Sequence, residues 1–161
     1  MDENKIVLDR KAFGALAVDS RVKILKALKE RKRRIKPTER KALEKELWDL
    51  TAQYVKARDK KCVTCGTDQK LTLSHWQKCG KQRIRYDLRN CNCQCSSCNN
   101  RHNYYTAYYD NYVLRHYGAK AMLELIELAM LPKWKWSVIQ LREMVLERRA
   151  QLKVLKAKTG V

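Results

Sequence analysis

Apolar residues recur at helical spacing on both sides of a cysteine-rich centre. Before the centre they lie three to four residues apart: Leu43, Leu47, Leu50 and Tyr54. This spacing places the side chains on one face of a helix, which we expect to be capped by Thr38 and to end near residues 58–59. An earlier helix is predicted from Ser20 up to Pro37, because proline disfavours helical backbone in the residue before it.

Three further apolar segments follow the centre. The first is predicted as a helix that opens at Cys95 and runs through Tyr109, with the pattern continuing to Gly118, a residue that commonly ends helices. The second is a short apolar helix over residues 119–131. The third follows a capping box formed by Ser137 and Gln140. No internal repeat is present.

The centre itself carries a strand pattern. Apolar and polar residues alternate over residues 71–76, as on a half-buried strand. Residues 77–83 are rich in basic and amide side chains and predict a loop, after which Ile84–Leu88 is expected to form the returning strand. The sequence therefore predicts a mostly helical α+β fold.

Seven cysteines occur, and four of them form two C-x2-C pairs: Cys62, Cys65, Cys95 and Cys98. Two such pairs are a common way to supply four thiolates to structural Zn²⁺, which we favour over a redox or disulfide role. Cys91 and Cys93 alternate on a strand beside the metal, so packing is favoured over a second metal site. Cys79 remains without an assigned role.

The balance of charge indicates a polyanionic partner. The 161 residues include 36 Lys and Arg against 17 Asp and Glu, a net charge of +19. Nucleic acid is the first candidate, and a merely solvated basic surface is the alternative. The N-terminus has no signal-peptide pattern, and no apolar stretch approaches the ~20 residues that span a membrane. A cytoplasmic protein without membrane contact is expected.

His75 is the one histidine between the cysteine pairs. Hydrolysis of a phosphodiester needs a base that deprotonates water and a cation that neutralises the phosphate. Imidazole suits the first task near neutral pH, although a lone histidine on a strand more often only packs or bonds. The flanking cysteine pairs and downstream asparagines favour the base.

Together these residues resemble a known family. A C-x2-C pair, a histidine on a strand, an asparagine five residues before the second pair and another directly after it are typical of HNH, or ββα-metal, nucleases. The chain is most similar to the NinG/Rap group of phage recombination endonucleases. The resemblance runs from about Leu47 to Leu155 and leaves residues 1–40 uncovered. The helix pattern and the basic run predict a basic helical arm over residues 1–40, and the resemblance implies a nuclease domain over residues 41–161, with its zinc knuckle and active site at 60–105.

The resemblance also implies roles for single residues. His75 is the general base, Asn90 braces the hairpin and orients it, and Asn99 binds a catalytic Mg²⁺ or Mn²⁺. Many HNH enzymes place an Asp metal ligand where this chain has Ser74. His102 is therefore the first candidate for the second ligand and Asn103 the next, and the alternative for His102 is a solvent-facing residue or a phosphate contact. Asn92 stands where the group often has His, which weakens any role for that position.

The implied partner is branched DNA, such as Holliday junctions and flaps. Expected phosphate contacts are Arg31, Lys32, Arg33, Arg34, Lys78, Lys81, Arg83, Arg85 and Arg101. Trp76 and the tyrosines of residues 104–109 are candidates either for base stacking or for core packing. Symmetric cleavage of a four-way junction predicts a homodimer. The alternatives are an HNH nuclease for linear duplex DNA and a non-catalytic zinc-ribbon module that binds nucleic acid.

Overall fold

The computed structural model describes residues 19–20, 22–23, 26 and 37–159. The chain divides into two compact units, Met1–Glu39 and Arg40–Val161. The described residues of the first 26 are helical and exposed. The basic run Arg31–Arg34 lies outside the described residues, and so does the predicted end of the first helix. The role of residues 1–40 as a DNA-binding arm stays a prediction.

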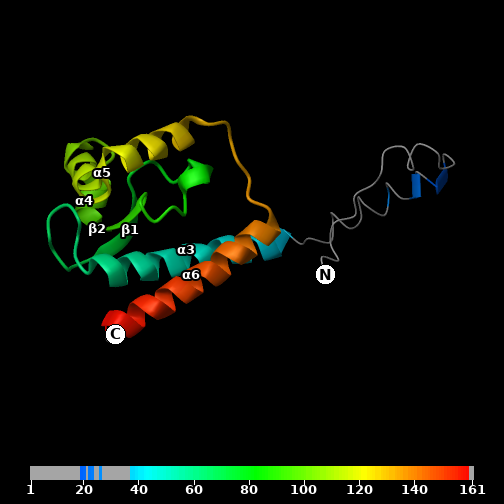
Figure 1. Cartoon of the computed structure of the whole chain (residues 1–161), viewed down its shortest axis with the longest axis horizontal. Coiled ribbons are helices and arrows are strands. Elements are labelled where there is room, and N and C mark those ends of the chain that lie inside the picture. The colour runs from blue at the N-terminus through cyan, green and yellow to red at the C-terminus, as the bar shows by residue number, and fades with distance from the viewer. Residues whose placement is uncertain (1–18, 21, 24–25, 27–36, 160–161) are drawn as a thin grey trace. The chain divides into compact units, whose positions relative to one another are not determined.

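Two long helices, α3 (Pro37–Asp59) and α6 (Val138–Thr159), lie side by side (Figure 1). Leu47 of α3 and Leu141 and Val145 of α6 are buried in one core cluster, which Tyr86 from the segment between the strands completes. Helix α3 begins at Pro37, so the predicted cap, Thr38, lies inside it; proline is favoured in the first turn, where its missing N–H is not needed. The predicted capping box of α6 is confirmed, because Ser137 and Gln140 each accept a hydrogen bond from the other's backbone N–H.

Between these helices in sequence lies an antiparallel hairpin of β1 (Leu71–His75) and β2 (Cys91–Cys95), with His75 opposite Cys91. The predicted returning strand at residues 84–88 is wrong. Gln82–Ile84 form the 3-10 helix η1, and the Asp87 carbonyl accepts hydrogen bonds from the backbone N–H groups of Asn90 and Cys91, both at 3.0 Å. Turn residues whose side chains also bond locally compete with strand pairing here.

Helix α4 (Ser96–Arg101) follows β2 directly, and α5 (Ala107–Met130) comes after a turn. The prediction of one helix through Tyr109 is wrong, because the backbone N–H groups of Tyr104 and Tyr105 both bond the Arg101 carbonyl and close α4 there. Gly118 interrupts α5 with φ +83° and ψ 164°, and the two halves of α5 run in different directions in Figure 1. The expected helix break at this glycine is confirmed.

The described part of the chain is a mostly helical α+β fold, with four α-helices, one two-stranded hairpin and a four-cysteine cluster between them. This confirms the predicted fold class. A core of Trp76, Ile84, Tyr109, Val113 and Leu125 packs α5 against the connection between the strands. None of the described helices is long and apolar enough to cross a membrane.

Candidate metal centre and active-site cavity

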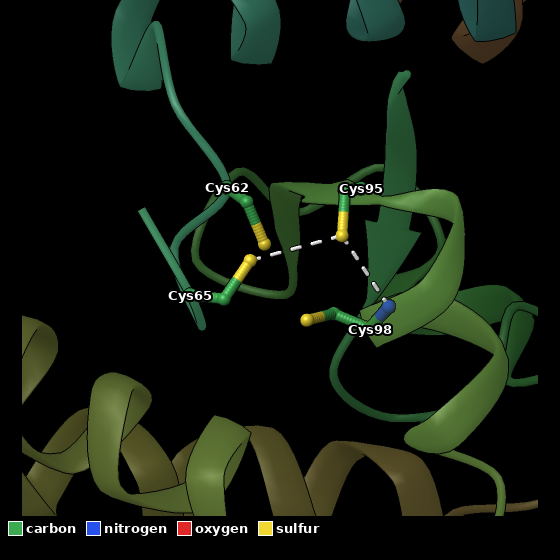
Figure 2. Close-up of side chains that lie close together, drawn as sticks. All are labelled: Cys62, Cys65, Cys95 and Cys98. Atoms are coloured by element: carbon green, nitrogen blue, oxygen red, sulfur yellow. Dashed lines mark hydrogen bonds between the residues drawn. The ribbon is translucent and has the colours of Figure 1, made fainter. Parts of the chain in front are cut away.

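The two cysteine pairs converge on one point. The sulfurs of Cys62, Cys65, Cys95 and Cys98 all lie within 4.8 Å of one another (Figure 2). Four sulfurs at about 2.3 Å from a tetrahedral Zn²⁺ would be about 3.8 Å apart, and the Sγ atoms of Cys65 and Cys95 are 3.8 Å apart. A disulfide would need a separation of about 2.05 Å. The donor set and its spacing therefore fit a structural zinc ion.

Local backbone geometry presents each pair. Cys95 ends β2 and is also the N-cap of α4, where its sulfur accepts a hydrogen bond from the backbone N–H of Cys98 at 3.4 Å. Gly66 follows the first pair with φ +78°, a conformation that glycine adopts without strain, and its N–H bonds the Cys62 carbonyl. The N–H of Val63 bonds the Cys93 carbonyl, which ties the first pair to β2.

The other three cysteines lie outside this cluster. Cys91 and Cys93 are fully buried in β2, while Cys79 is exposed. Burial raises the pKa of Cys91 to about 12 and that of Cys93 to about 11. Both thiols are buried and lie outside the four-sulfur cluster, and Cys91 packs in a core with Val55 and Leu73.

An open cavity of about 760 Å³ is lined in part by the end of β1 and by the residues that follow it. Several predicted site residues line it together with neighbours from α3, α4 and α5: Trp48, Ser74, His75, Trp76, Lys78, Asn99, His102, Asn103, Thr106 and Asp110. The fold thus brings His75, Asn99 and His102 to the wall of one cavity, although 27 positions separate the first from the last in sequence. Catalytic roles for these residues stay predictions.

The imidazole of His75 contacts Arg85 and Trp48. Its Nε2 lies 2.9 Å from the Arg85 carbonyl oxygen, which can only accept, so Nε2 carries the proton and Nδ1 the lone pair. The ring stacks on Trp48 with 5.2 Å between centroids, and the Arg85 guanidinium lies over the same indole. Burial, with the Arg85 charge adding to it, lowers the pKa of His75 to about 4. The imidazole is therefore neutral at physiological pH.

Asn90 organises the segment that orients this histidine. Its side chain is fully buried, its Oδ1 accepts a hydrogen bond from the Gln77 N–H at 2.7 Å, and its Nδ2 donates to the Gln77 and Ile84 carbonyls at 3.1 Å each. These bonds join both ends of the segment that leads from His75 to Arg85. Asn90 does not line the cavity itself; its hydrogen bonds act on the backbone next to the cavity residues.

Asn99 projects from α4 towards β1. Its Oδ1 lies 2.9 Å from the Ser74 hydroxyl, which also lies 2.6 Å from Gln94 Oε1. The hydroxyl has one proton and donates to one of these oxygens at a time. Asn99 Oδ1 therefore keeps lone pairs for a further ligand.

Trp76 connects two more residues of the cavity. Its carbonyl accepts a hydrogen bond from His102 Nε2 at 2.9 Å, and its indole N–H donates to Asp110 Oδ1 at 2.6 Å. The Nδ1 atom of His102 is enclosed and has no hydrogen-bond partner among the described residues. Asp110 is the single carboxylate on the described wall of the cavity. Sequence reasoning missed it, because it lies in α5 with no motif around it; it also missed Trp48, which read as an apolar flank of α3.

The predicted phosphate-contacting residues divide into two kinds. Lys78, Lys81 and Arg101 are exposed. Arg83 packs over the Trp134 ring at 4.4 Å and bonds the Pro132 carbonyl, while Arg85 lies between the rings of Trp48 and Tyr86. Arg83 and Arg85 therefore contribute to packing as well as to the positive charge.

Asn92 belongs to a buried hydrogen-bond network. It is fully buried, and its Oδ1 accepts hydrogen bonds of 2.8 Å from Arg58 and from the Tyr117 hydroxyl. Burial alone would lower the pKa of Arg58, but the hydrogen bond and charge of Asp59 outweigh it and raise that pKa. Asp59 in turn accepts from the Cys93 N–H at 2.8 Å. This network fastens the end of α3 to β2 beneath the hairpin.

Comparison with known proteins identifies a family model that covers most of the chain. The family model described as the bacteriophage lambda NinG protein matches residues 12–158. The match begins well before Leu47, so it includes part of the N-terminal segment that the motif resemblance left uncovered. No curated protein and no solved structure matches the chain.

Proposed function

This chain belongs to the NinG family of bacteriophage proteins, and on that basis we propose that it is a metal-dependent endonuclease that cuts branched DNA. One observation carries most weight: His75 and Asn99, which lie in different elements, line one open cavity, and Asn99 directly follows Cys98 of the four-cysteine cluster. A structural zinc ion suits this part of the fold, because a small hairpin buries too little apolar surface to be stable by itself.

The chemistry assigned to His75 follows from its hydrogen bond. Because Nε2 donates to the Arg85 carbonyl, Nδ1 is the atom that can take a proton from water in the cavity. The resulting hydroxide would attack phosphorus and break its bond to the 3′-oxygen, leaving a 5′-phosphate and a 3′-hydroxyl. Arg85, Trp48 and Asn90 keep the ring in place during this step.

A Mg²⁺ or Mn²⁺ ion, when bound, would neutralise charge on the scissile phosphate and the leaving oxygen. The predicted ligands are Asn99 and His102. These hard cations prefer oxygen ligands, and the free nitrogen of His102 is enclosed. Asn99 Oδ1 and the Asp110 carboxylate therefore suit the cation better, and Asp110 would supply the negative charge that Ser74 lacks.

The substrate class rests on family membership and on charge. Lys78 lines the cavity and is exposed, as is Lys81, three residues further along the chain. Arg101 lies in the last turn of α4. With a net charge of +19, the logarithm of DNA affinity should fall steeply with the logarithm of salt concentration. Two symmetric cuts in a four-way junction need two sites, which favours a homodimer. Exposed apolar side chains on the second half of α5, such as Leu123 and Met130, offer a surface for it.

The test is a cleavage assay on a four-way junction, a flap and a linear duplex with matching arms. Wild type with Mg²⁺ or Mn²⁺ should cut the branched substrates faster than the duplex. His75→Ala should lose cleavage by a factor of about 10²–10⁴, the usual contribution of a general base, while zinc content and DNA affinity stay unchanged. His116→Ala is the matched control, because His116 is exposed on α5 and lies outside the cavity.

Each other outcome favours a different function. Equal cutting of junction and linear duplex would indicate an HNH nuclease for plain duplex DNA. DNA binding without cleavage of any substrate, with either cation, would indicate a zinc-ribbon binding module. Full activity of His75→Ala would refute the assignment of the base.

A further inference from the structure

Three tyrosines on the turn between α4 and α5 and in the first turn of α5 are exposed. The exposed fractions of Tyr104, Tyr105 and Tyr108 are 84%, 68% and 65%. The other aromatic candidates of this region behave differently, since Trp76 is 4% exposed and Tyr109 only 1%. The sequence left open whether this group stacks on DNA or packs in the core; the structure separates it into buried core residues and an exposed set.

The exposed set lies beside the candidate active site. Asn103 and Thr106, which flank Tyr104 and Tyr105 in sequence, line the cavity to which His75 also contributes. Tyr105 and Tyr108 line a small neighbouring hollow. The aromatic rings therefore lie next to the place where a scissile phosphate would bind.

Basic side chains flank the tyrosines. Arg101 lines the same small hollow, and Arg115 lines a further one together with Tyr108; both arginines are exposed. Within the described residues, none of the three tyrosine hydroxyls makes a hydrogen bond, whereas the buried Tyr109 bonds the Ser74 carbonyl. Exposed rings without internal partners, bordered by cations, suit a ligand with flat faces and negative charge.

We propose that Tyr104, Tyr105 and Tyr108 form a stacking platform for unpaired nucleobases at a DNA branch point. The proposal rests on nucleic acid as the partner in the proposed function. Paired bases in a duplex are covered on both faces, while bases at a branch can expose one. Stacking on tyrosine tolerates any base, so the platform selects DNA structure without reading sequence, and Arg101 and Arg115 bind the adjoining phosphates.

The test measures binding with no Mg²⁺ or Mn²⁺ added, so that cleavage does not interfere. The probe is a four-way junction with 2-aminopurine beside the branch, compared with a linear duplex that carries 2-aminopurine in the same sequence. Wild type should quench the fluorescence of the junction and leave that of the duplex unchanged. Replacing all three tyrosines by alanine should abolish quenching and weaken junction binding by about 5- to 100-fold per stacked base, with duplex affinity unchanged.

Two further variants control for folding and for loss of apolar surface. Replacing the three tyrosines by phenylalanine keeps the rings and should retain both quenching and affinity. Leu146→Ala with Val154→Ala removes exposed apolar side chains of α6 and should bind as wild type. Zinc content and the circular dichroism spectrum report whether each variant folds.

The remaining results would overturn the platform. Equal loss of junction and duplex affinity in the alanine variant would mean that the tyrosines contact the DNA backbone. Unchanged binding would mean that they serve a different partner, such as a protein. Failure of the proposed nuclease activity is a separate result. If the protein quenches the junction bases but never cuts DNA, the stacking proposal stands and the nuclease proposal is refuted.

Discussion

The protonation of His75 gives the sharpest test of the site. Burial lowers its pKa from 6.5 to about 4, and the ring of Trp48 contributes by stacking on it at 5.2 Å. Trp48→Ala should let water reach the imidazole and restore part of its solvation. A return of the pKa from about 4 to 6.5 corresponds to about 3 kcal/mol, so the pKa of His75 in Trp48→Ala should rise towards 6.5, with this free energy as the upper limit.

Nuclear magnetic resonance can follow this directly, because the chain has only three histidines: His75, His102 and His116. In wild type, the His75 ring signals should stay constant from pH 8 to pH 5, and the nitrogen shifts should show the proton on Nε2. In Trp48→Ala, the same signals should titrate at higher pH. Trp48→Phe keeps an aromatic ring and should shift the pKa less.

The direction of the pH dependence follows from the lowered pKa. Between pH 6.5 and 4 the unfolded chain binds a proton at His75 that the folded chain does not, so stability should fall as pH falls through this window. Cleavage should be insensitive to His75 protonation above pH 5. A wild-type His75 that titrates near 6.5, or that carries its proton on Nδ1, would refute the environment assigned to this residue.

Three further predictions concern the zinc cluster, the bend in α5 and the cation. Cys65→Ser should release zinc and unfold the hairpin, because structural zinc contributes about 10 kcal/mol or more; metal analysis and circular dichroism would show this, with the exposed Cys79→Ser as a neutral control. Gly118→Ala should destabilise the protein by about 1–3 kcal/mol in urea unfolding, because φ +83° and ψ 164° are nearly restricted to glycine. Nothing lies within 4 Å of its added Cβ, and Gly80→Ala, equally unobstructed and without a positive φ, should change little. Asp110→Asn keeps an acceptor for the Trp76 indole but removes the charge, so its cleavage should need higher Mg²⁺; an unchanged Mg²⁺ dependence would exclude Asp110 as a ligand.

Local pattern was sufficient for the elements whose apolar face packs on a neighbour. The periodic leucines of α3, the capping box of α6 and the break at Gly118 were all predicted, because helix periodicity, caps and glycine freedom act within a few residues. The pairing of Cys62 and Cys65 with Cys95 and Cys98 was also predicted, since only a shared metal explains two such short spacings so well.

Sequence-based predictions were wrong where turn hydrogen bonds compete with those of a strand or a helix. Residues 84–88 were predicted as a strand, yet Asp87 and Asn90 hold this segment in turns through backbone and side-chain hydrogen bonds. The helix expected from Cys95 to Tyr109 ends at Arg101 for a similar reason. Such choices depend on partners that are fixed only when the chain is folded.

By itself, the sequence determined two cysteine pairs suited to one metal, placed between helices, a strongly positive net charge, and a candidate histidine with two asparagines. Only the tertiary structure decided the state of that histidine, because Trp48 and the Arg85 carbonyl approach it from separate segments. It also placed Asp110 in the cavity and left Tyr104, Tyr105 and Tyr108 in solvent while Trp76 and Tyr109 became core. Burial and electrostatic environment arise from neighbours distant in sequence, and no local pattern records them.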